Sequence, residues 1–239
     1  MPNSALDRAC EMWAGLAGVP IAFPQRGGVS VVTSAESRLC PPQWAGIVAL
    51  GGAAIATVPD SRLVEPLRDT LVNQAGETMI DLERLKATLA VVDVLGPATL
   101  AYLDAEDFVT VHGATAVERL PAGHHDVRGL LAAAEDADAD ESGLEGITSA
   151  AFVVRDGPEV IAAAGYRSWP GSVAHLCILT ASRYRGRGLA RLAASAAVAD
   201  ALESRLVPQW RARPEPSRRV ARALGFRELG TQVSVRPGL

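Results

Sequence analysis

A short basic turn contains the residues of this sequence whose types and spacing best suit ligand binding: Arg185, Gly186, Arg187, Gly188, Leu189 and Ala190. The turn lies between an apolar stretch, 173–180, and an alanine-rich stretch, 188–203, that is typical of a helix. The first turn of a helix has backbone amides without an acceptor inside the helix, and the helix dipole favours negative charge there. The strand, turn and helix therefore predict an anion-binding site, with a pyrophosphate as the expected ligand.

Hydrophobic periodicity places this turn within a series of strands and helices. Strands are expected at 150–155 and 160–168, joined by a tight turn at Asp156-Gly157-Pro158. The stretch 173–180 is apolar on both faces apart from His175 and Thr180, which predicts a central strand buried on both sides. The elements expected after the helix at 188–203 are a strand at 207–212, a helix that ends at Gly225, and a strand at 228–235.

The N-terminal half has a pattern of its own. Its expected elements are a helix at 6–16, strands at 28–33 and 46–58, helices at 65–73 and 81–89, and a strand at 99–103 after a break at Gly96-Pro97. The stretch 46–58 is expected to fold into a hairpin at Gly51-Gly52. A strand at 116–120, the turn Pro121-Ala122-Gly123 and a helix at 125–137 restart the pattern. We therefore expect two domains, 1–115 and 116–239, of which the first is a smaller, diverged α/β lobe.

Composition and charge exclude several classes of protein. The chain has 239 residues, 49% of them hydrophobic, and its three widely spaced cysteines (Cys10, Cys40, Cys177) indicate neither a disulfide framework nor a zinc site. We expect no metal, no membrane span and no targeting signal, and hence a cytoplasmic protein. A net charge of -4 argues against a nucleic-acid partner. The charges are segregated, because 183–227 holds eleven arginines and three acidic residues, whereas 135–145 holds six acidic residues and no basic one.

Two landmarks make residues 116–236 resemble the GCN5-related N-acetyltransferase (GNAT) family. The cofactor motif of the family is Gln or Arg, two residues, Gly, one residue, and Gly or Ala, which Arg185, Gly188 and Ala190 match in register. The second landmark, a helix ending in Leu-Gly-Phe, matches Leu224-Gly225-Phe226. The resemblance implies an α/β (α+β) fold with a mixed, mostly antiparallel sheet and flanking helices. Residues 1–115 carry no such landmark, although their elements could form a degenerate lobe of similar kind.

The resemblance also implies that acetyl-CoA binds as cosubstrate in a split between the strand at 173–180 and the next strand. The pantetheine arm would pair with the free edge of the first strand, and the pyrophosphate would rest on the amides of the basic turn. The residues expected to bind acetyl-CoA are Ile178, Leu179, Thr180, Arg185, Gly186, Arg187, Gly188, Leu189, Ala190 and Arg191.

Direct attack of a neutral amine on the thioester, which the resemblance implies, needs a general base and no protein nucleophile. Glu145, which follows Gly143 in the loop before the strand at 150–155, is the first candidate, and its alternative is a solvated loop acid. His175 is the second candidate because a histidine can change protonation near neutral pH, and its alternative is a packed, hydrogen-bonded histidine. Cys177 is interpreted as a small buried apolar residue.

The sequence departs from the family at two positions. Many members have an asparagine and a proton-donating tyrosine where this sequence has Pro214 and Ala221. The departing sulfur would then be protonated by water, Tyr166 or Tyr184, or CoA leaves as the thiolate, or the activity is weak. We include Tyr166 among the catalytic candidates, and its alternative is an ordinary strand aromatic.

These interpretations predict an N-acetyltransferase that moves an acetyl group from acetyl-CoA to a primary amine in a ternary complex. The acidic segment 135–145, expected to be a loop, suits a cationic acceptor such as a polyamine, an aminoglycoside-like base or a peptide N-terminus. Trp169 and Trp210 either shape the acceptor pocket or pack in the core. The alternative function, motivated by Pro214 and Ala221, is a catalytically silent acyl-CoA-binding sensor or assembly module. No nucleic acid or membrane partner is expected, and a monomer and a homodimer both remain open.

Overall fold

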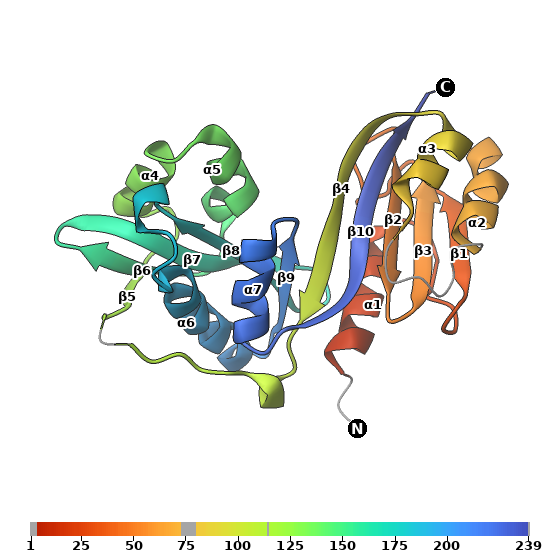
Figure 1. The fold of residues 1–239 in the computed structure, drawn as a ribbon. Helices are drawn as coiled ribbons and strands as arrows, with labels where there is room; N and C mark the ends of the chain where they lie inside the picture. The colour runs from red at the N-terminus through yellow and green to blue at the C-terminus, as the bar shows by residue number, and fades with distance from the viewer. Residues whose placement is uncertain (1–3, 73–79, 114, 239) are drawn as a thin grey trace. The chain divides into compact units, whose positions relative to one another are not determined.

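The computed structural model describes residues 4–72, 80–113 and 115–238, and the chain divides into two compact units (Figure 1). Unit 1 takes the residues up to Ala101, Arg211–Pro214 and the residues from Glu228 onward, and unit 2 takes Tyr102–Trp210 and Glu215–Arg227. This division differs from the predicted split between 115 and 116, because residues 102–113 belong to unit 2 and most of the last strand belongs to unit 1. The predicted helix at 65–73 ends at its last described residue, Val72, and position 73 lies outside the described residues.

Unit 1 is built on a sheet with the strand order β1-β3-β2-β10-β4. Its strands are β1 (Val29–Thr33), β2 (Ala45–Leu50), β3 (Ala53–Val58), β4 (Val91–Tyr102) and β10 (Arg227–Pro237). The predicted hairpin at Gly51-Gly52 is confirmed, since β2 and β3 pair in antiparallel register and both glycines have the positive φ angles that a tight turn requires. β10 pairs antiparallel with β2, and β1 runs parallel to β3.

The helices of unit 1 cover this sheet with apolar faces. They are α1 (Ala5–Leu16), α2 (Val64–Val72), which follows a short 3₁₀ turn η1 (Ser61–Leu63), and α3 (Leu82–Leu89). Leucines of α2 and α3 pack with valines and isoleucines of the sheet in one buried cluster. β4 begins well before the predicted strand and passes through Gly96, where a break was expected. Glycine suits this position because a Cβ atom there would lie 2.9 Å from the carbonyl oxygen of Gln232 on β10.

Unit 2 is built on a sheet with the strand order β9-β8-β7-β6-β5. Its strands are β5 (Glu118–Leu120), β6 (Ala151–Asp156), β7 (Glu159–Trp169), β8 (Val173–Thr180) and β9 (Val207–Ala212). Neighbouring strands from β5 to β8 are antiparallel, and only β8 and β9 are parallel. The predicted central strand at 173–180 is confirmed, because most of the side chains of β8 are buried.

Helices cover both faces of the unit 2 sheet. They are α4 (His125–Ala132), α5 (Asp136–Ser142), α6 (Leu189–Glu203) and α7 (Glu215–Ala223), with 3₁₀ turns η2 (Ala105–Asp107), η3 (Leu144–Gly146) and η4 (Ser182–Tyr184). Residues of α4 and η3 pack with Cys177 and Leu179 of β8 in one cluster, and α6 lies on the opposite face (Figure 1). None of the helices within the described residues has the length and apolar character needed to cross a membrane.

The acidic segment 135–145 corrects one sequence prediction. It was expected to be a loop after a helix at 125–137, but α4 ends at Ala132 and most of the acidic segment forms the separate helix α5. Asp136 and Asp138 lie in the first turn of α5, where the unpaired amides stabilise negative charge, and Gly143 ends the helix in the left-handed conformation. Charge alone therefore did not distinguish a solvated loop from a short helix.

Candidate functional site

The parallel strands β8 and β9 separate soon after they begin. Their paired positions are Val173 with Val207, Ala174 with Pro208, and His175 with Gln209. β8 continues to Thr180, and no residue from Leu176 onward is paired with β9 in the described structure. The other edge of β8 stays paired with β7 over the whole strand. The backbone of β8 therefore has an edge without a neighbouring strand, which can pair with an extended ligand as an added strand would.

The basic turn lies at the end of this separated segment. Gly186 and Gly188 both have φ = +78°, and a Cβ atom added to either would have no neighbour within 4 Å. Gly188 is the N-cap of α6, and the first hydrogen bond of the helix runs from the amide of Leu192 to the carbonyl of Gly188. In the described part of the chain, the amides of residues 186–191 donate to no backbone carbonyl. The turn therefore offers an open group of unpaired donors at a helix N-terminus, as an anion requires.

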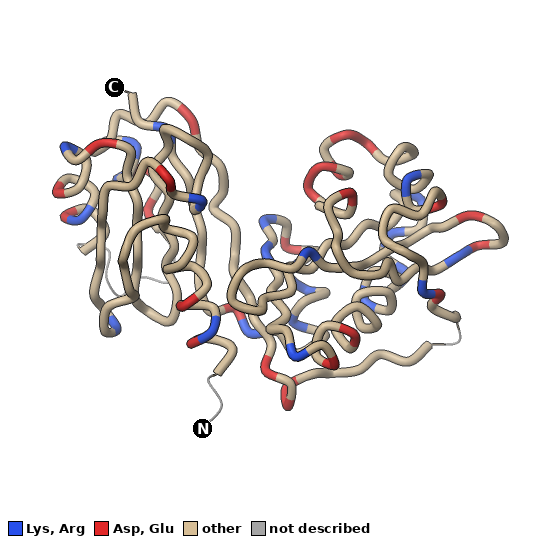
Figure 2. The backbone as a smooth tube through the Cα atoms, turned by 180° about the vertical axis from the view of Figure 1, so that it is seen from behind, with Lys and Arg blue, Asp and Glu red and all other residues tan. Residues whose placement is uncertain are grey.

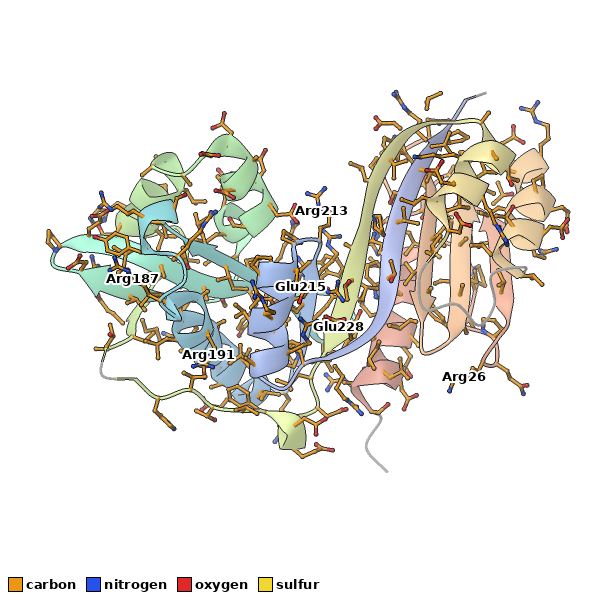
Figure 3. The ribbon with its side chains drawn as sticks, in the orientation of Figure 1. Arg26, Arg187, Arg191, Arg213, Glu215 and Glu228 are labelled. Atoms are coloured by element: carbon orange, nitrogen blue, oxygen red, sulfur yellow. The ribbon has the colours of Figure 1, made fainter. Side chains whose placement is uncertain are left out.

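The arginines of the turn have different surroundings. Arg185 forms an ion pair with Asp138 of α5, with 2.6 Å between Nη2 and Oδ2. Arg187 lies 5.1 Å from the centroid of the Tyr184 ring, and Arg191 is exposed in the first turn of α6 (Figure 3). Arg187 and Arg191 are therefore the arginines whose charge remains available to an anion in the turn, whereas Arg185 is partly neutralised by Asp138.

The catalytic candidates from the sequence lie on two faces of the unit 2 sheet. Side chains alternate along β8, so His175 is on the face of Cys177 and Leu179, which α4 and η3 cover. Glu145 belongs to η3 on the same face, where Gly143 approaches β8 so closely that an added Cβ would lie 3.1 Å from the sulfur of Cys177. His175 and Glu145 are thus brought to one side of β8, and the carboxylate of Glu145 is exposed without an ion pair among the described residues.

Tyr166 lies on the other face. Its hydroxyl donates a hydrogen bond of 2.8 Å to a carboxylate oxygen of Asp200 in α6. Burial and this neighbouring carboxylate raise the pKa of Tyr166. The second tyrosine considered from the sequence, Tyr184, donates its hydroxyl to Asp156 at 2.8 Å, and this bond together with desolvation raises its pKa. Both phenols are protonated at neutral pH, and each already has a carboxylate acceptor.

His175 is held by two side chains. Its Nδ1 atom lies 3.0 Å from Oε1 of Gln209, and its ring stacks on Trp169 with 4.8 Å between centroids. Gln209 in turn donates from Nε2 to the hydroxyl of Tyr102 at 2.7 Å. The sequence analysis missed Gln209, Tyr102 and the partner of Arg185. A polar Gln209 between the apolar residues Pro208 and Trp210 was the available signal, whereas nothing local in the sequence indicates its contact with Tyr102.

The other side chains considered in the sequence, one cysteine and two tryptophans, pack against neighbouring residues. Cys177 is 2% exposed among apolar side chains, which confirms its interpretation as a buried residue. Trp210 is buried, donates to the hydroxyl of Ser217 and contacts Phe226 edge-on, so it packs in the core. Trp169 is the tryptophan that reaches a candidate catalytic side chain, because it stacks on His175.

One group of side chains could in principle bind a metal ion. Ligand atoms of His124, His125 and Asp126 lie within 4.8 Å of one another at the start of α4. Nδ1 of His124 already accepts the backbone amide of Asp126, and a carboxylate oxygen of Asp126 pairs with Arg155 at 2.6 Å. The hydrogen bond from Arg155 is also the main cause of the lowered pKa of Asp126. His124 therefore caps α4, and Asp126 forms an ion pair with Arg155.

Residues 148–231 match the family model described as GNAT acetyltransferase. The matched segment begins just before β6 and ends within β10, so it includes the separation of β8 and β9, the basic turn and Leu224-Gly225-Phe226. Residues 148–231 are therefore similar to the GNAT acetyltransferase family, and the resemblance identified from the sequence is confirmed for this segment. No curated protein matches the sequence.

Solved structures are similar to this chain at low sequence identity. A GCN5-related N-acetyltransferase from Kribbella flavida is 15% identical, with 79% of this chain and 88% of that chain covered and a TM-score of 0.52. An acetyltransferase of the GNAT family from Colwellia psychrerythraea is 14% identical, with 76% and 75% covered and a TM-score of 0.49. A tandem GNAT protein from the clavulanic acid biosynthesis pathway is 14% identical, with 100% and 98% covered and a TM-score of 0.45. The first of these confirms the predicted fold class, and a GNAT-like origin of unit 1 stays a prediction.

Proposed function

We propose that this protein transfers the acetyl group of acetyl-CoA to a primary amine. Acyl transfer from acetyl-CoA is the activity that the GNAT family indicates. The observation that supports it most in this chain is the separation of β8 from β9 after His175 and Gln209, followed directly by the open amides of the basic turn.

The residues of this segment fit acetyl-CoA. The unpaired edge of β8 at Ile178, Leu179 and Thr180 would hold the amide groups of the pantetheine arm by backbone hydrogen bonds. The amides of residues 186–191 would bind the pyrophosphate, and Arg187 and Arg191 would add charge-assisted contacts. When bound there, acetyl-CoA supplies an acetyl group that is already activated as a thioester.

The chemistry that remains for the protein is positioning and proton transfer. The acceptor ammonium gives one proton to a base and its nitrogen forms the new bond to the carbonyl carbon while the carbon–sulfur bond breaks. A second ammonium proton passes to the departing sulfur, so the products are the N-acetyl amine, CoA and one proton. His175 and Glu145 are the candidate bases because both lie on one side of β8. Tyr166 is the proposed relay for this second proton: its hydroxyl would donate its own proton to the sulfur and take the ammonium proton in return.

The proposed acceptor is a cationic amine. The acidic residues of the segment 135–145 gather on α5 and η3, which lie against β8 on the side of His175 (Figure 2). A cluster of carboxylates raises the local concentration of cations and slows the approach of anions. A polyamine, an aminoglycoside-like base and a peptide N-terminus all carry the required positive charge.

The test is CoA release by the purified protein. The protein is incubated with acetyl-CoA and a panel of cationic and neutral amines, and the free thiol is followed over time, with heat-unfolded protein as the control for spontaneous acetylation. We expect release that needs the folded protein and that is faster with cationic amines. Tight acetyl-CoA binding without turnover on any amine would instead favour a silent acyl-CoA-binding module. Absence of acetyl-CoA binding would contradict both functions.

A further inference from the structure

The position where β8 and β9 separate contains a buried polar network. Gln209 is 0% exposed and Tyr102 is 1% exposed, so the amide of Gln209 has to find its hydrogen-bond partners inside the protein. It uses both ends. Oε1 faces Nδ1 of His175 at 3.0 Å, and Nε2 donates to the hydroxyl of Tyr102 at 2.7 Å. His175 and Gln209 are also the last paired positions of the two strands, so the network stands where the split begins.

The orientation of the Gln209 amide in this network assigns the proton of His175 to one ring nitrogen. An amide oxygen only accepts hydrogen bonds and an amide NH₂ group only donates them. With Nε2 of Gln209 directed to Tyr102, the group facing His175 is an acceptor, and Nδ1 of His175 must therefore carry its proton. The lone pair of the neutral imidazole is then on its Nε2 atom. The reversed amide would require the opposite arrangement, with a proton on Nε2 of His175.

The ring of His175 is also held in orientation. Trp169 stacks on it with an interplanar angle of 27° and 4.8 Å between centroids, while Gln209 holds its Nδ1 edge. The side chain is only half-buried, unlike Gln209 and Tyr102 behind it. The ring therefore has a fixed orientation and a fixed tautomer, and it is partly open to solvent where β8 and β9 separate. These are the features of a prepared proton acceptor.

We propose that His175 is the general base of the acetyl transfer, and that Gln209 and Tyr102 are positioning residues that keep the proton on its Nδ1 atom. The inference rests on the proposed function and deepens it. Nε2 of His175 takes one proton from the acceptor ammonium and later releases it to solvent, which leaves the amine nitrogen with the electron pair that forms the bond to the acetyl carbon. Gln209 accepts from Nδ1 throughout and stabilises the imidazolium while it exists.

The first experiment reads the tautomer without turnover. Protein with ¹⁵N-labelled histidine is studied by long-range ¹H–¹⁵N correlation at a pH where the ring is neutral, and the His175→Gln variant identifies the signals of His175 among the four histidines. We expect the pattern of a proton on Nδ1. In Tyr102→Phe, the amide of Gln209 loses an acceptor and can reverse, so signals of the other tautomer are expected. A proton on Nε2 in the unchanged protein would overturn the inference.

The second experiment measures turnover with the best acceptor from the amine panel. Removing a general base typically costs about 10²–10⁴-fold in rate, so we expect His175→Gln to lower kcat by at least about 100-fold with the KM for acetyl-CoA little changed. Tyr102→Phe should lower kcat by a smaller factor, about 10-fold, because part of the population keeps the productive tautomer. If His175→Gln keeps its kcat within about threefold while Glu145→Gln loses it, Glu145 is the base and the inference is wrong.

A matched control separates positioning from simple loss of a buried hydrogen bond. Ser217→Ala removes the hydroxyl that accepts from Nε1 of Trp210, the neighbour of Gln209 on β9. It should lower the melting temperature by a few degrees, about as much as Tyr102→Phe, and leave both the tautomer and kcat unchanged. Equal losses of kcat in the two variants would overturn the positioning role. If the unchanged protein shows no turnover with any amine, the proposed function fails, and the tautomer experiment still reports on the network itself.

Discussion

Replacing Gly188 with glutamate would place bulk and negative charge against the open amides that precede α6. Gly188 has φ = +78° and is the N-cap of α6, and an added Cβ would meet no atom within 4 Å. The substitution therefore disturbs no packing. It has two effects: it strains the backbone, because a residue with a Cβ atom must adopt a positive φ angle, and it places a carboxylate at the proposed pyrophosphate site.

The two effects have different magnitudes. A residue with a Cβ atom in the left-handed region costs about 1–2 kcal/mol, or a melting temperature lower by about 2–8 °C in a chain of this size. The carboxylate contributes about 4 kcal/mol of repulsion per unit of phosphate charge at 4 Å with an effective dielectric constant of about 20, and half as much at about 8 Å. A loss of about 2–4 kcal/mol raises the Kd for acetyl-CoA by about 30- to 1,000-fold.

Titration calorimetry with acetyl-CoA at low and moderate salt measures this change, and a thermal melt without ligand measures the backbone cost. Gly123→Glu is the matched control, because Gly123 also has a positive φ of +69° and no neighbour within 4 Å of an added Cβ. We expect similar melting temperatures for the two variants and weaker binding only for Gly188→Glu. Equal affinities, within about threefold, would refute the assignment of the pyrophosphate site.

Two further substitutions in unit 2 and one labelling experiment in unit 1 test other contacts. Asp138→Asn should tighten acetyl-CoA binding by about two- to fivefold, because it releases Arg185 from its ion pair with Asp138. This ion pair is half-exposed and stabilises the fold by at most about 1 kcal/mol. Unchanged or weaker binding would contradict this prediction. Tyr166→Phe should lower the free energy of unfolding by about 1–3 kcal/mol, since the carboxylate of Asp200 loses a buried donor, and a urea titration with no shift of its midpoint would argue against that bond. Burial, and then the nearby acidic residues of α1, raise the pKa of Cys10 to about 11, so its thiolate fraction at pH 7.5 is about 100-fold below that of an ordinary thiol. Iodoacetamide labelling followed by mass spectrometry should find slow modification of Cys10 that becomes rapid on unfolding, and equal rates in both states would be inconsistent with this environment.

The basic turn and its strand were predictable because their signals are local. Apolar residues on both faces of 173–180 indicate a central strand, and the glycines at 186 and 188 indicate a turn with positive φ angles, which residues with a Cβ atom rarely adopt. The order of helices and strands followed from the same periodicity in most places. The helix α5 did not, because its seven residues are mostly acidic or small and have no apolar stripe that marks a helix.

The environment of His175 was not predictable for a different reason. Gln209, which faces its Nδ1 atom, is 34 positions away in sequence, and Tyr102 behind it is 107 positions from Gln209. Hydrophobic patterns assign residues to faces of a strand, but they do not say which buried polar groups meet. The sequence therefore indicated that His175 is either a base or a packed histidine, and the structure shows a histidine that is hydrogen-bonded and also partly exposed.

The place of β10 in unit 1 has a consequence for biosynthesis. In the sheet of unit 1, β10 lies between β2 and β4, although the whole of unit 2 separates it from them along the chain. A ribosome that has made β1 to β4 must continue for several seconds to about half a minute, at about 5–20 residues per second, before β10 emerges. Until then the edges of β2 and β4 that β10 will join have no partner, and such edges are prone to pair with other chains. Unit 2, which contains the proposed catalytic site, is thus complete before the N-terminal unit can close its sheet.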